Sequence, residues 1–376
     1  SASSDAITLA SDGTCTANIT NNLSNRNLII NGAMQVAQRG TSATNSGYGS
    51  VDRMYVIFSG TDESPTHAQA DVASGTTPYT LGFRKCLKVT NGNQTSGADA
   101  GDLITIQTRL EAQDIANSGW NYTSASSFIT VQFWIKSSVA QTFKGYIRTK
   151  DGTGKIYPFD TGSLSADTWT KITKTIPGHA DLQFDNNVEQ GIQVNIAAFW
   201  GTNYTDNSVT ENAWADYAGS TRTKDNTSTW YTTNDATLEF TGMQLEVGSV
   251  ATDFEHRSFA DELRRCQRYY QRQAGPSDAY IQPGKGQGTT AIDAGYALSI
   301  PLRAEPTVAC GSNRVFMHNG YSNSTTAPSV IQWSTTESPY SSVIALRFSG
   351  HSSITSNYVC AWCPTFGSVL TLDAEI

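Results

Sequence analysis

The stretch 128–136, FITVQFWIK, alternates apolar and polar residues with a period of two, which is typical of a β-strand with one buried face. The residues on its apolar face are Ile129, Val131, Phe133 and Ile135. A second strand-like stretch, 143–150, follows after a short turn, and the Asp151-Gly152 pair behind it is a hairpin signal. Consecutive strands joined by short turns predict an antiparallel sheet in this part of the chain.

The same pattern extends in both directions from this hairpin. Short alternating stretches, separated by turn residues, occur at 27–34, 52–58, 86–90, 103–110, 169–176, 191–200 and 237–247. In the last of them, Gly242 interrupts the alternation as a β-bulge would. About nine or ten strands at this spacing predict a β-sandwich of the jelly-roll type over residues 27–257. Residues 1–26 alternate only weakly, so we expect an extended N-terminal segment there.

Residues 258–275 depart from the β pattern and predict one connecting helix, which we expect to span 258–273. Ser258 is suited to cap it, and Asp261 falls in its first turn, where the helix dipole favours negative charge. Gly275-Pro276 ends it. Strand signals then return at 296–302, 307–310, 314–317, 330–333, 342–348, 357–362 and 369–374. The fold class we expect is therefore mainly β, with a second, smaller β-sandwich domain over 276–376.

Composition excludes several functional classes. Only 15 % of the residues are charged and the net charge is −8, whereas nucleic-acid binding needs clustered Lys and Arg. Aromatic residues reach 10 %, which argues against disorder. No apolar run approaches the roughly 18 residues that a membrane span requires. The chain begins at Ser1, without a methionine or an export signal, so we expect a fragment or a processed chain.

The cysteines do not indicate a disulfide framework. All six are widely scattered, at positions 15, 86, 266, 310, 360 and 363. Cys360 and Cys363 form a CxxC pair on a predicted strand, where positions three apart point to opposite faces, so we expect buried, reduced thiols rather than a metal site. Asp151, Asp185 and Asn186 could ligate a structural calcium ion, although hydrated turn residues explain them as well. No other cofactor is expected.

The strongest candidate ligand site is a group of aromatic residues in the polar stretch 200–235. Sugars present C–H faces and hydroxyl groups, which suit flat aromatic side chains placed among a few polar groups. The alternative is that these aromatic side chains fill the sandwich core. The group consists of Trp200, Tyr204, Trp214, Tyr217, Trp230 and Tyr231, with Trp120 and Tyr122 as weaker members.

Two further groups are candidates for contacts with other molecules. The first lies in Ser- and Asn-rich connections of the C-terminal domain, where loops can carry receptor contacts: Trp333, Tyr340, His318 and His351. The second lies on the predicted helix: Arg264, Arg265, Arg268 and Arg272. Positions 264, 268 and 272 share one helical face, which predicts docking onto an acidic partner such as a neighbouring subunit. A solvated helix face is the alternative.

Catalysis has little support in the sequence. No GxSxG, HExxH, P-loop or dinucleotide fingerprint is present. Carboxylate pairs such as Asp160 and Glu239 cannot be placed at a catalytic separation from sequence alone. We therefore expect a protein that is not an enzyme, with a glycan depolymerase as the lesser alternative.

The run 242–271, GMQLEVGSVATDFEHRSFADELRRCQRYYQ, resembles a segment that recurs in tail-fibre and related host-attachment proteins of tailed bacteriophages. The resemblance extends to NLIINGAMQVAQRG at 27–40, to Val51-Asp52-Arg53 and to the proline-flanked SIPLRAEPT at 299–307. It implies a virion tail or fibre protein, commonly trimeric, with a jelly roll similar to carbohydrate-binding modules and a C-terminal tip domain. Physically, the run is most simply a joint between a strand and the helix that follows it.

These observations lead to one hypothesis of function. We expect a tail protein of the virion, assembled in the host cytoplasm, that recognises the host surface through multivalent glycan binding. Its expected partners are two further copies of itself, other virion tail proteins, and a host polysaccharide or outer-surface protein. The alternative is a purely structural fibre, baseplate or head-decoration protein without a receptor site.

Overall fold

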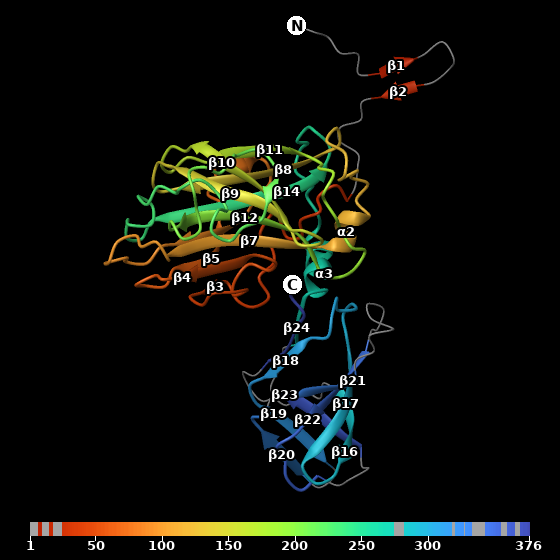
Figure 1. The fold of residues 1–376 in the computed structure, drawn as a ribbon. Coiled ribbons are helices and arrows are strands. Elements are labelled where there is room, and N and C mark those ends of the chain that lie inside the picture. Colours follow the sequence, from red (N-terminus) through yellow and green to blue (C-terminus); the bar gives the residue numbers. More distant parts are fainter. Residues whose placement is uncertain are drawn as a thin grey trace.

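The computed structural model describes residues 7–9, 15–17, 25–273, 282–317, 320–326, 328–332, 343–354, 359–364 and 369–376. Within these ranges the fold class is confirmed: the chain is mainly β, with two six-stranded antiparallel sheets followed by a smaller C-terminal β part (Figure 1). A short antiparallel pair, β1 (Ile7–Leu9) and β2 (Cys15–Ala17), precedes the sandwich.

One sheet of the sandwich, here called the front sheet, has the strand order β13-β10-β9-β12-β7-β4. Its strands are β4 (Tyr55–Ser59), β7 (Leu103–Glu111), β9 (Thr142–Thr149), β10 (Lys155–Ser163), β12 (Gln190–Trp200) and β13 (Ala215–Asp216). The short helix α2 (Ala112–Ala116) follows β7 directly.

The other sheet, the back sheet, has the order β11-β8-β14-β6-β5-β3. Its strands are β3 (Ser42–Ala43), β5 (Thr66–Asp71), β6 (Lys85–Thr90), β8 (Phe128–Ser137), β11 (Thr170–Pro177) and β14 (Thr237–Val247). A one-turn helix, α1 (Thr77–Thr80), connects β5 to β6.

The core lies between these two sheets, and the period-two pattern of the sequence places it there. The alternating residues of β8 (Ile129, Val131, Phe133 and Ile135) are at most 1 % exposed. They meet residues such as Ile106 of β7 and Val194 of β12 from the front sheet in one continuous apolar cluster. The opposite side chains of each strand therefore form the two outer faces of the sandwich.

The connecting helix is shorter than the sequence predicts. Helix α3 spans Phe259–Gln267, and the hydroxyl of Ser258 accepts the backbone N–H of Asp261 at 3.2 Å, as expected for a cap. The expectation that it continues to residue 273 is wrong, because Tyr270–Gln273 forms strand β15. This strand pairs antiparallel with β24 (Leu370–Asp373) near the end of the chain. Strand pairing over that distance overrides the local helical spacing.

The C-terminal part contains two sheets. A three-stranded sheet has the order β15-β24-β18, with β18 spanning Thr307–Cys310. A seven-stranded sheet has the order β20-β19-β23-β16-β17-β22-β21. Its strands are β16 (Gln282–Gln287), β17 (Ala291–Ala297), β19 (Asn313–Met317), β20 (Gly320–Ser324), β21 (Ser329–Gln332), β22 (Val343–Phe348) and β23 (Val359–Pro364). They share a second apolar core that includes Leu302, Val315 and Leu346.

The last residues of the chain turn back into the joint between the two parts, so the C-terminus lies beside α3 (Figure 1). The backbone N–H of Ala374 donates to the carbonyl of Tyr269 at 2.8 Å. Arg303 joins three segments: its guanidinium donates to the carbonyls of Ala374, Glu375 and, across the joint, Val188. Sequence positions from the middle and the end of the chain thus meet at one place.

Two expectations about the chain can be compared with this fold. Cys86, Cys266 and Cys310 are buried and free, as predicted, whereas the side chains of Cys15, Cys360 and Cys363 lie outside the described residues. The backbone of Cys360 and Cys363 lies on β23, in the predicted strand. In the described ranges, α3 is the longest helix, and none is long and apolar enough to cross a membrane.

Candidate ligand-binding face

The structure divides the predicted aromatic group among several environments. Trp230 and Tyr231 are at most 1 % exposed and lie in the core between the sheets. The Tyr231 ring stacks on Phe199 with 4.5 Å between centroids, and Trp230 Nε1 donates to the carbonyl of Thr237 at 3.0 Å. These two residues are therefore not part of an open sugar platform, and the core alternative is correct for them. Burial of their large aromatic rings determines where they lie, although the neighbouring residues in the sequence are polar.

Trp214, Trp120 and Tyr122 also have structural roles. Trp214 is half-buried, its Nε1 donates to the carbonyl of Pro177 at 2.7 Å, and its ring meets Tyr157 edge-on. Trp120 is buried and Tyr122 half-buried, and both pack against Phe184. Each of these rings fills space where a loop meets the sandwich.

The other three members, Trp200, Tyr204 and Tyr217, come together on the outer side of the front sheet. Trp200 is buried there rather than open, stacked on Tyr146 at 5.4 Å with 17° between the ring planes. Its Nε1 has no hydrogen-bond partner in the part of the chain that the structure describes. Tyr204 and Tyr217 remain half-exposed. The fold therefore brings only part of the predicted aromatic group to one surface.

Strand register defines the rest of this surface, here called the front face. Gln193 of β12 pairs with Arg109 of β7 on one side and with Arg148 of β9 on the other. Because paired residues point to the same side of a sheet, the three side chains form one row. The next row, two residues along each strand, runs Tyr55, Gln107, Asn195, Tyr146 and Pro158 across five strands. Amides, arginines and aromatic rings thus alternate across the sheet.

A long connection covers one end of the front face. It runs from Gly201, after β12, and lies along β10, where the N–H of Asn212 donates to the carbonyl of Pro158 at 2.8 Å. It then returns, and Thr205 and Thr223 form a parallel bridge between its two arms. The Arg222 guanidinium lies 4.7 Å from the ring centroid of Tyr204. This cover is why Asn195 and Tyr146 are buried.

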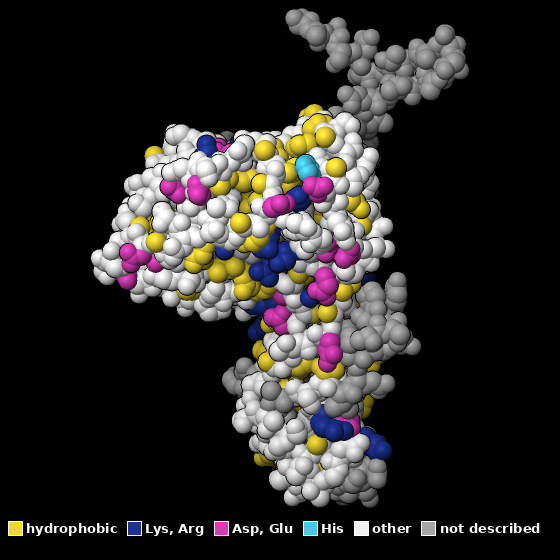
Figure 2. Space-filling view, viewed as in Figure 1, with side chains coloured by type: hydrophobic (Ala, Val, Ile, Leu, Met, Phe, Trp, Pro, Cys, Tyr) yellow, Lys and Arg dark blue, Asp and Glu magenta, His cyan; other side chains and the backbone are white. Residues whose placement is uncertain are grey.

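The other end of the front face is basic, and it is only partly open, because Ile376 lies against Arg109 there. Arg109, Arg148 and Lys150 lie there, and Lys150 is exposed. The Arg148 guanidinium stacks on the Tyr217 ring at 3.3 Å, and the Arg109 guanidinium stacks on Tyr55 at 4.2 Å. Partial desolvation of its ammonium group and the neighbouring positive charges of Arg148 and Arg109 lower the pKa of Lys150. Figure 2 shows Lys and Arg side chains gathered on the sandwich where it approaches the C-terminal domain.

Sequence reasoning missed this basic end, although a signal was present. Arg109, Arg148 and Gln193 occupy the polar positions of stretches whose apolar positions predict the core. On a two-sided strand those polar positions share the outer face. Only the strand order, which the sequence does not reveal, brings the three stretches into neighbouring positions.

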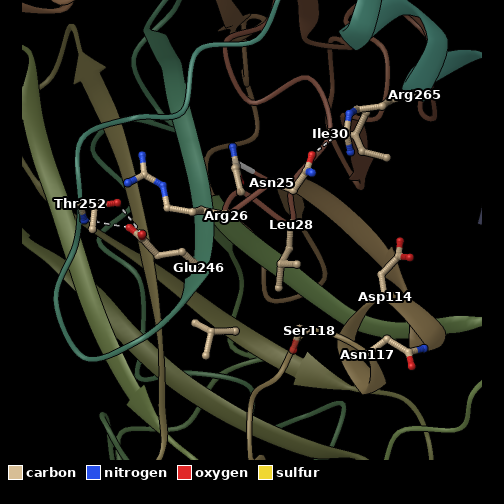
Figure 3. A pocket seen from close by; sticks show the side chains of 12 residues that line it. Asn25, Arg26, Leu28, Ile30, Asp114, Asn117, Ser118, Glu246, Thr252 and Arg265 are labelled. Atoms are coloured by element: carbon tan, nitrogen blue, oxygen red, sulfur yellow. Dashed lines mark hydrogen bonds between the residues drawn. The ribbon is translucent and has the colours of Figure 1, made fainter. Parts of the chain in front are cut away.

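Two further hollows lie elsewhere on the sandwich. A cavity of about 560 Å³ opens beside α2, α3 and β14. Figure 3 shows Asp114, Asn117 and Ser118 along one side of it, with Arg26, Glu246 and Thr252 opposite. A smaller cavity of about 240 Å³ lies on the back sheet, where Phe83, Phe254 and Trp134 are among the lining residues.

The predicted tip residues are corrected in part. His351 is 4 % exposed, and its Nε2 lies 2.9 Å from Asn313 Oδ1, so it is a buried polar contact rather than an exposed receptor contact. Burial lowers its pKa, which favours the neutral ring. His318, Trp333 and Tyr340 lie outside the described residues.

Arg264, Arg268 and Arg272 do not share one helical face, because Arg272 lies on β15. Arg268 donates from Nε and Nη2 to the two carboxylate oxygens of Glu111, at 2.7 and 2.8 Å. Arg265 donates to Asn25 Oδ1 at 2.7 Å, and Arg264 is exposed. Arg268 and Arg265 thus bind within the chain, which corrects the expectation of one shared docking face.

No group of three or more His, Cys, Asp and Glu side chains suited to a metal ion occurs in the described residues. Asp151 Oδ2 accepts the backbone N–H of Asp185 at 3.0 Å, a contact of the kind that turns make. The calcium expectation for these residues stays a prediction.

Comparison with known proteins gives likenesses of structure only. No protein-family model and no curated protein matches the chain. Among solved structures, the chain is similar to the enzymatically active domain of bacteriophage CBA120 tailspike protein 4, with 9 % identity, a TM-score of 0.31, and coverage of 59 % of this chain and 21 % of that chain. The chain therefore spans about a fifth of that tailspike domain.

Two carbohydrate-binding domains are also similar in structure. One is the family 11 carbohydrate-binding module from Clostridium thermocellum in complex with a mixed-linked tetrasaccharide, with 11 % identity, a TM-score of 0.25, and coverage of 57 % of this chain and 98 % of that chain. The other is the N-terminal cellulose-binding domain of Cellulomonas fimi β-1,4-glucanase C, with 9 % identity, a TM-score of 0.27, and coverage of 57 % and 99 %.

Proposed function

We propose that this chain is a host-attachment protein of a tailed bacteriophage virion, and that it binds host-surface glycans through the front face without cleaving them. The observation that carries the binding proposal is the register of the front sheet. It sets Tyr55, Arg109 and Arg148 on one outer face, around the amides of Gln107 and Gln193, which are only 7 % and 5 % exposed. Aromatic rings for the C–H faces of a sugar and amide or guanidinium groups for its hydroxyls are the elements of a glycan site.

The virion part of the proposal is supported by the sequence. The run from Gly242 to Gln271 resembles attachment proteins, and in the fold it forms the end of β14, the cap of α3 and the start of β15. It therefore builds the joint between the sandwich and the C-terminal sheets. A trimer joined in this way would present three equal faces, so that weak individual contacts add to stable attachment.

The test is binding of the full chain to a glycan array and to host cells. Tyr55→Ala removes a ring of the front face that lies under Arg109 at 4.2 Å. Tyr79→Ala is the matched control, because it removes a ring under Arg84 at 3.9 Å on α1, away from this face. We expect Tyr55→Ala to weaken glycan binding and Tyr79→Ala to leave it unchanged.

Three results would contradict the proposal. Equal binding by both variants and the unaltered chain would exclude the front face as the glycan-binding site. Binding to no glycan or host cell would favour a purely structural virion protein. Release of reducing ends from host polysaccharide would show an enzyme instead. Light scattering of the purified chain would test the trimer.

A further inference from the structure

The basic end of the front face has the geometry of an anion site. Arg109 and Arg148 lie two strands apart with Gln193 between them. At the usual spacing of neighbouring strands, their backbones are about 10 Å apart. Lys150 follows two positions after Arg148 and is exposed. We call these three residues, Arg109, Arg148 and Lys150, the front-face basic group.

No Asp or Glu side chain of the described residues forms an ion pair with this group, although Arg109 donates to an oxygen of the last residue, Ile376. Other cations of the same sheet do form ion pairs: Lys144 pairs with Glu211 at 2.7 Å, and Lys155 pairs with Asp216 at 2.7 Å. No such pair joins an Asp or Glu side chain to the front-face basic group within the ranges that the structure describes. Three such cations on one surface stand out on a chain with 33 acidic and 25 basic residues.

The two guanidinium groups are held in place by aromatic faces. Arg148 stacks on Tyr217 at 3.3 Å, and Arg109 stacks on Tyr55 at 4.2 Å. Arg109 also donates to Gln107 Oε1 and, at 2.5 Å, to the carbonyl of Ile376. The Arg148 Nε is buried without a partner among the described residues. Stacking fixes the plane of the Arg148 guanidinium and leaves its edge for a ligand, at little further cost in side-chain entropy. The nitrogens of Arg109 already donate to Gln107 and Ile376, so Arg109 contributes mainly its charge.

We propose that the front-face basic group binds the acidic groups of an anionic glycan, either carboxylates or phosphates. The planar edge of an arginine matches two oxygens of such a group and forms charge-assisted hydrogen bonds with them. Because Arg109 and Arg148 are separated by a whole strand, they suit successive acidic groups of a polymer better than one small anion. This inference rests on the proposed glycan-binding function and names its ligand class.

The test uses the full chain on an array that carries neutral, carboxylated and phosphorylated glycans in parallel. We expect binding to anionic glycans of one or both kinds, which the array distinguishes. Binding should weaken as the salt concentration rises from 50 to 300 mM, because mobile ions screen the attraction. Arg148→Gln and Lys150→Gln should each weaken it by roughly tenfold, the usual cost of losing a charged hydrogen bond.

Lys171→Gln is the matched control, because Lys171 is an exposed lysine on β11 of the back sheet and lies outside the front face. It should change binding by less than twofold, and thermal unfolding should show that all three variants stay folded. Binding to neutral glycans that is insensitive to salt and to Arg148→Gln would overturn the anionic class while leaving glycan binding itself intact. Binding to no glycan on the array would overturn the proposed function together with this inference.

Discussion

The carboxylate of Glu375 contacts the guanidinium of Arg53 inside the joint between the sandwich and the C-terminal sheets. Their side chains are only 6 % and 2 % exposed. Arg39 reaches the same carboxylate at 3.2 Å, and the Tyr269 ring lies 3.4 Å from the Arg53 guanidinium. A residue next to the end of the described chain is therefore fixed by two arginines of the sandwich. The joint is held by buried charge as well as by the pairing of β15 with β24.

Removing this carboxylate should destabilise the protein. In Glu375→Gln, two buried guanidinium groups lose the charge that compensates their desolvation, and we expect a loss of about 3 kcal/mol in the free energy of unfolding. Asp71→Asn is the control, because Asp71 forms an exposed pair with Lys85 at 2.6 Å. Its loss should stay below about 0.5 kcal/mol. Denaturant unfolding measures the free energy of unfolding of each variant. Equal losses in the two variants would show that the buried ion pair stabilises the protein no more than the exposed one.

Arg268 should matter more than the other arginines of its segment. Glu111 is 0 % exposed, and its two carboxylate oxygens accept from Arg268. Arg268→Ala leaves that carboxylate buried without its cation, so we expect a loss of about 3 to 5 kcal/mol. Arg264→Ala, at an exposed position of α3, should change stability by less than about 0.5 kcal/mol. Thermal unfolding of the two variants compares their stabilities. Similar shifts in the unfolding temperature would contradict the stabilising role assigned to Arg268.

The sequence predicts the sandwich well because its signal is local. The alternation in 128–136 specifies which side of β8 faces the core whatever strands lie next to it. The Ser258 cap is equally local, since it joins residues three apart. The end of the helix is not local: Tyr270 and its neighbours become a strand because Leu370–Asp373 offers a partner a hundred residues later.

The candidate site was only partly predictable for the same reason. Tyr217 and Trp200 could be recognised as candidates from their aromatic rings, yet Trp230 looks identical in sequence and lies in the core. Trp200 and Trp230 are equally buried and differ in location, since Trp230 lies between the two sheets and Trp200 lies on the outer side of the front sheet. That location depends on how the connection after β12 folds back on the sheet. Arg109 and Arg148 become neighbours only through the strand order. Spacing along the chain does not contain that order.

Gly242 should not tolerate a side chain. It lies at the bulge of β14 with φ of +63°, a left-handed conformation that favours glycine, and a Cβ there would approach Phe83 Cζ to 2.6 Å. We expect Gly242→Ala to cost about 2 kcal/mol or more. Gly219→Ala is the control, because no atom lies within 4 Å of its Cβ position. Denaturant midpoints measure the difference, and tolerance of Gly242→Ala would mean that the bulge rearranges freely.

Asp114 should make stability depend on pH. Desolvation of its carboxyl group and the charge of Glu111 raise its pKa from 3.8 to about 6. Between these values the folded chain binds a proton that the unfolded chain does not, so this group's contribution to the free energy of unfolding falls as the pH rises from 4 to 6. In Asp114→Asn the side chain does not titrate, so this fall in the free energy of unfolding between pH 4 and 6 should disappear.

Since Asp114 is exposed at the rim of the larger cavity, solvent screening reduces the gain expected for the variant to about 1 kcal/mol at pH 7. At pH 4 the two proteins should be nearly equal. Urea unfolding of both proteins at the two pH values measures this, and a difference that is the same at pH 4 and pH 7 would exclude titration of Asp114 as its cause.

Tyr217 should support glycan binding through its ring rather than its hydroxyl. The Arg148 guanidinium lies 3.3 Å from the ring centroid, so Tyr217→Phe keeps the stacking surface and Tyr217→Ala removes it. A cation–aromatic contact contributes about 0.5 to 2 kcal/mol, so we expect Tyr217→Ala to weaken anionic-glycan binding by about 2- to 30-fold. Tyr217→Phe should bind within twofold of the unaltered chain. Titration calorimetry measures both, and an equal loss in the two variants would assign the effect to the hydroxyl and refute the stacking role.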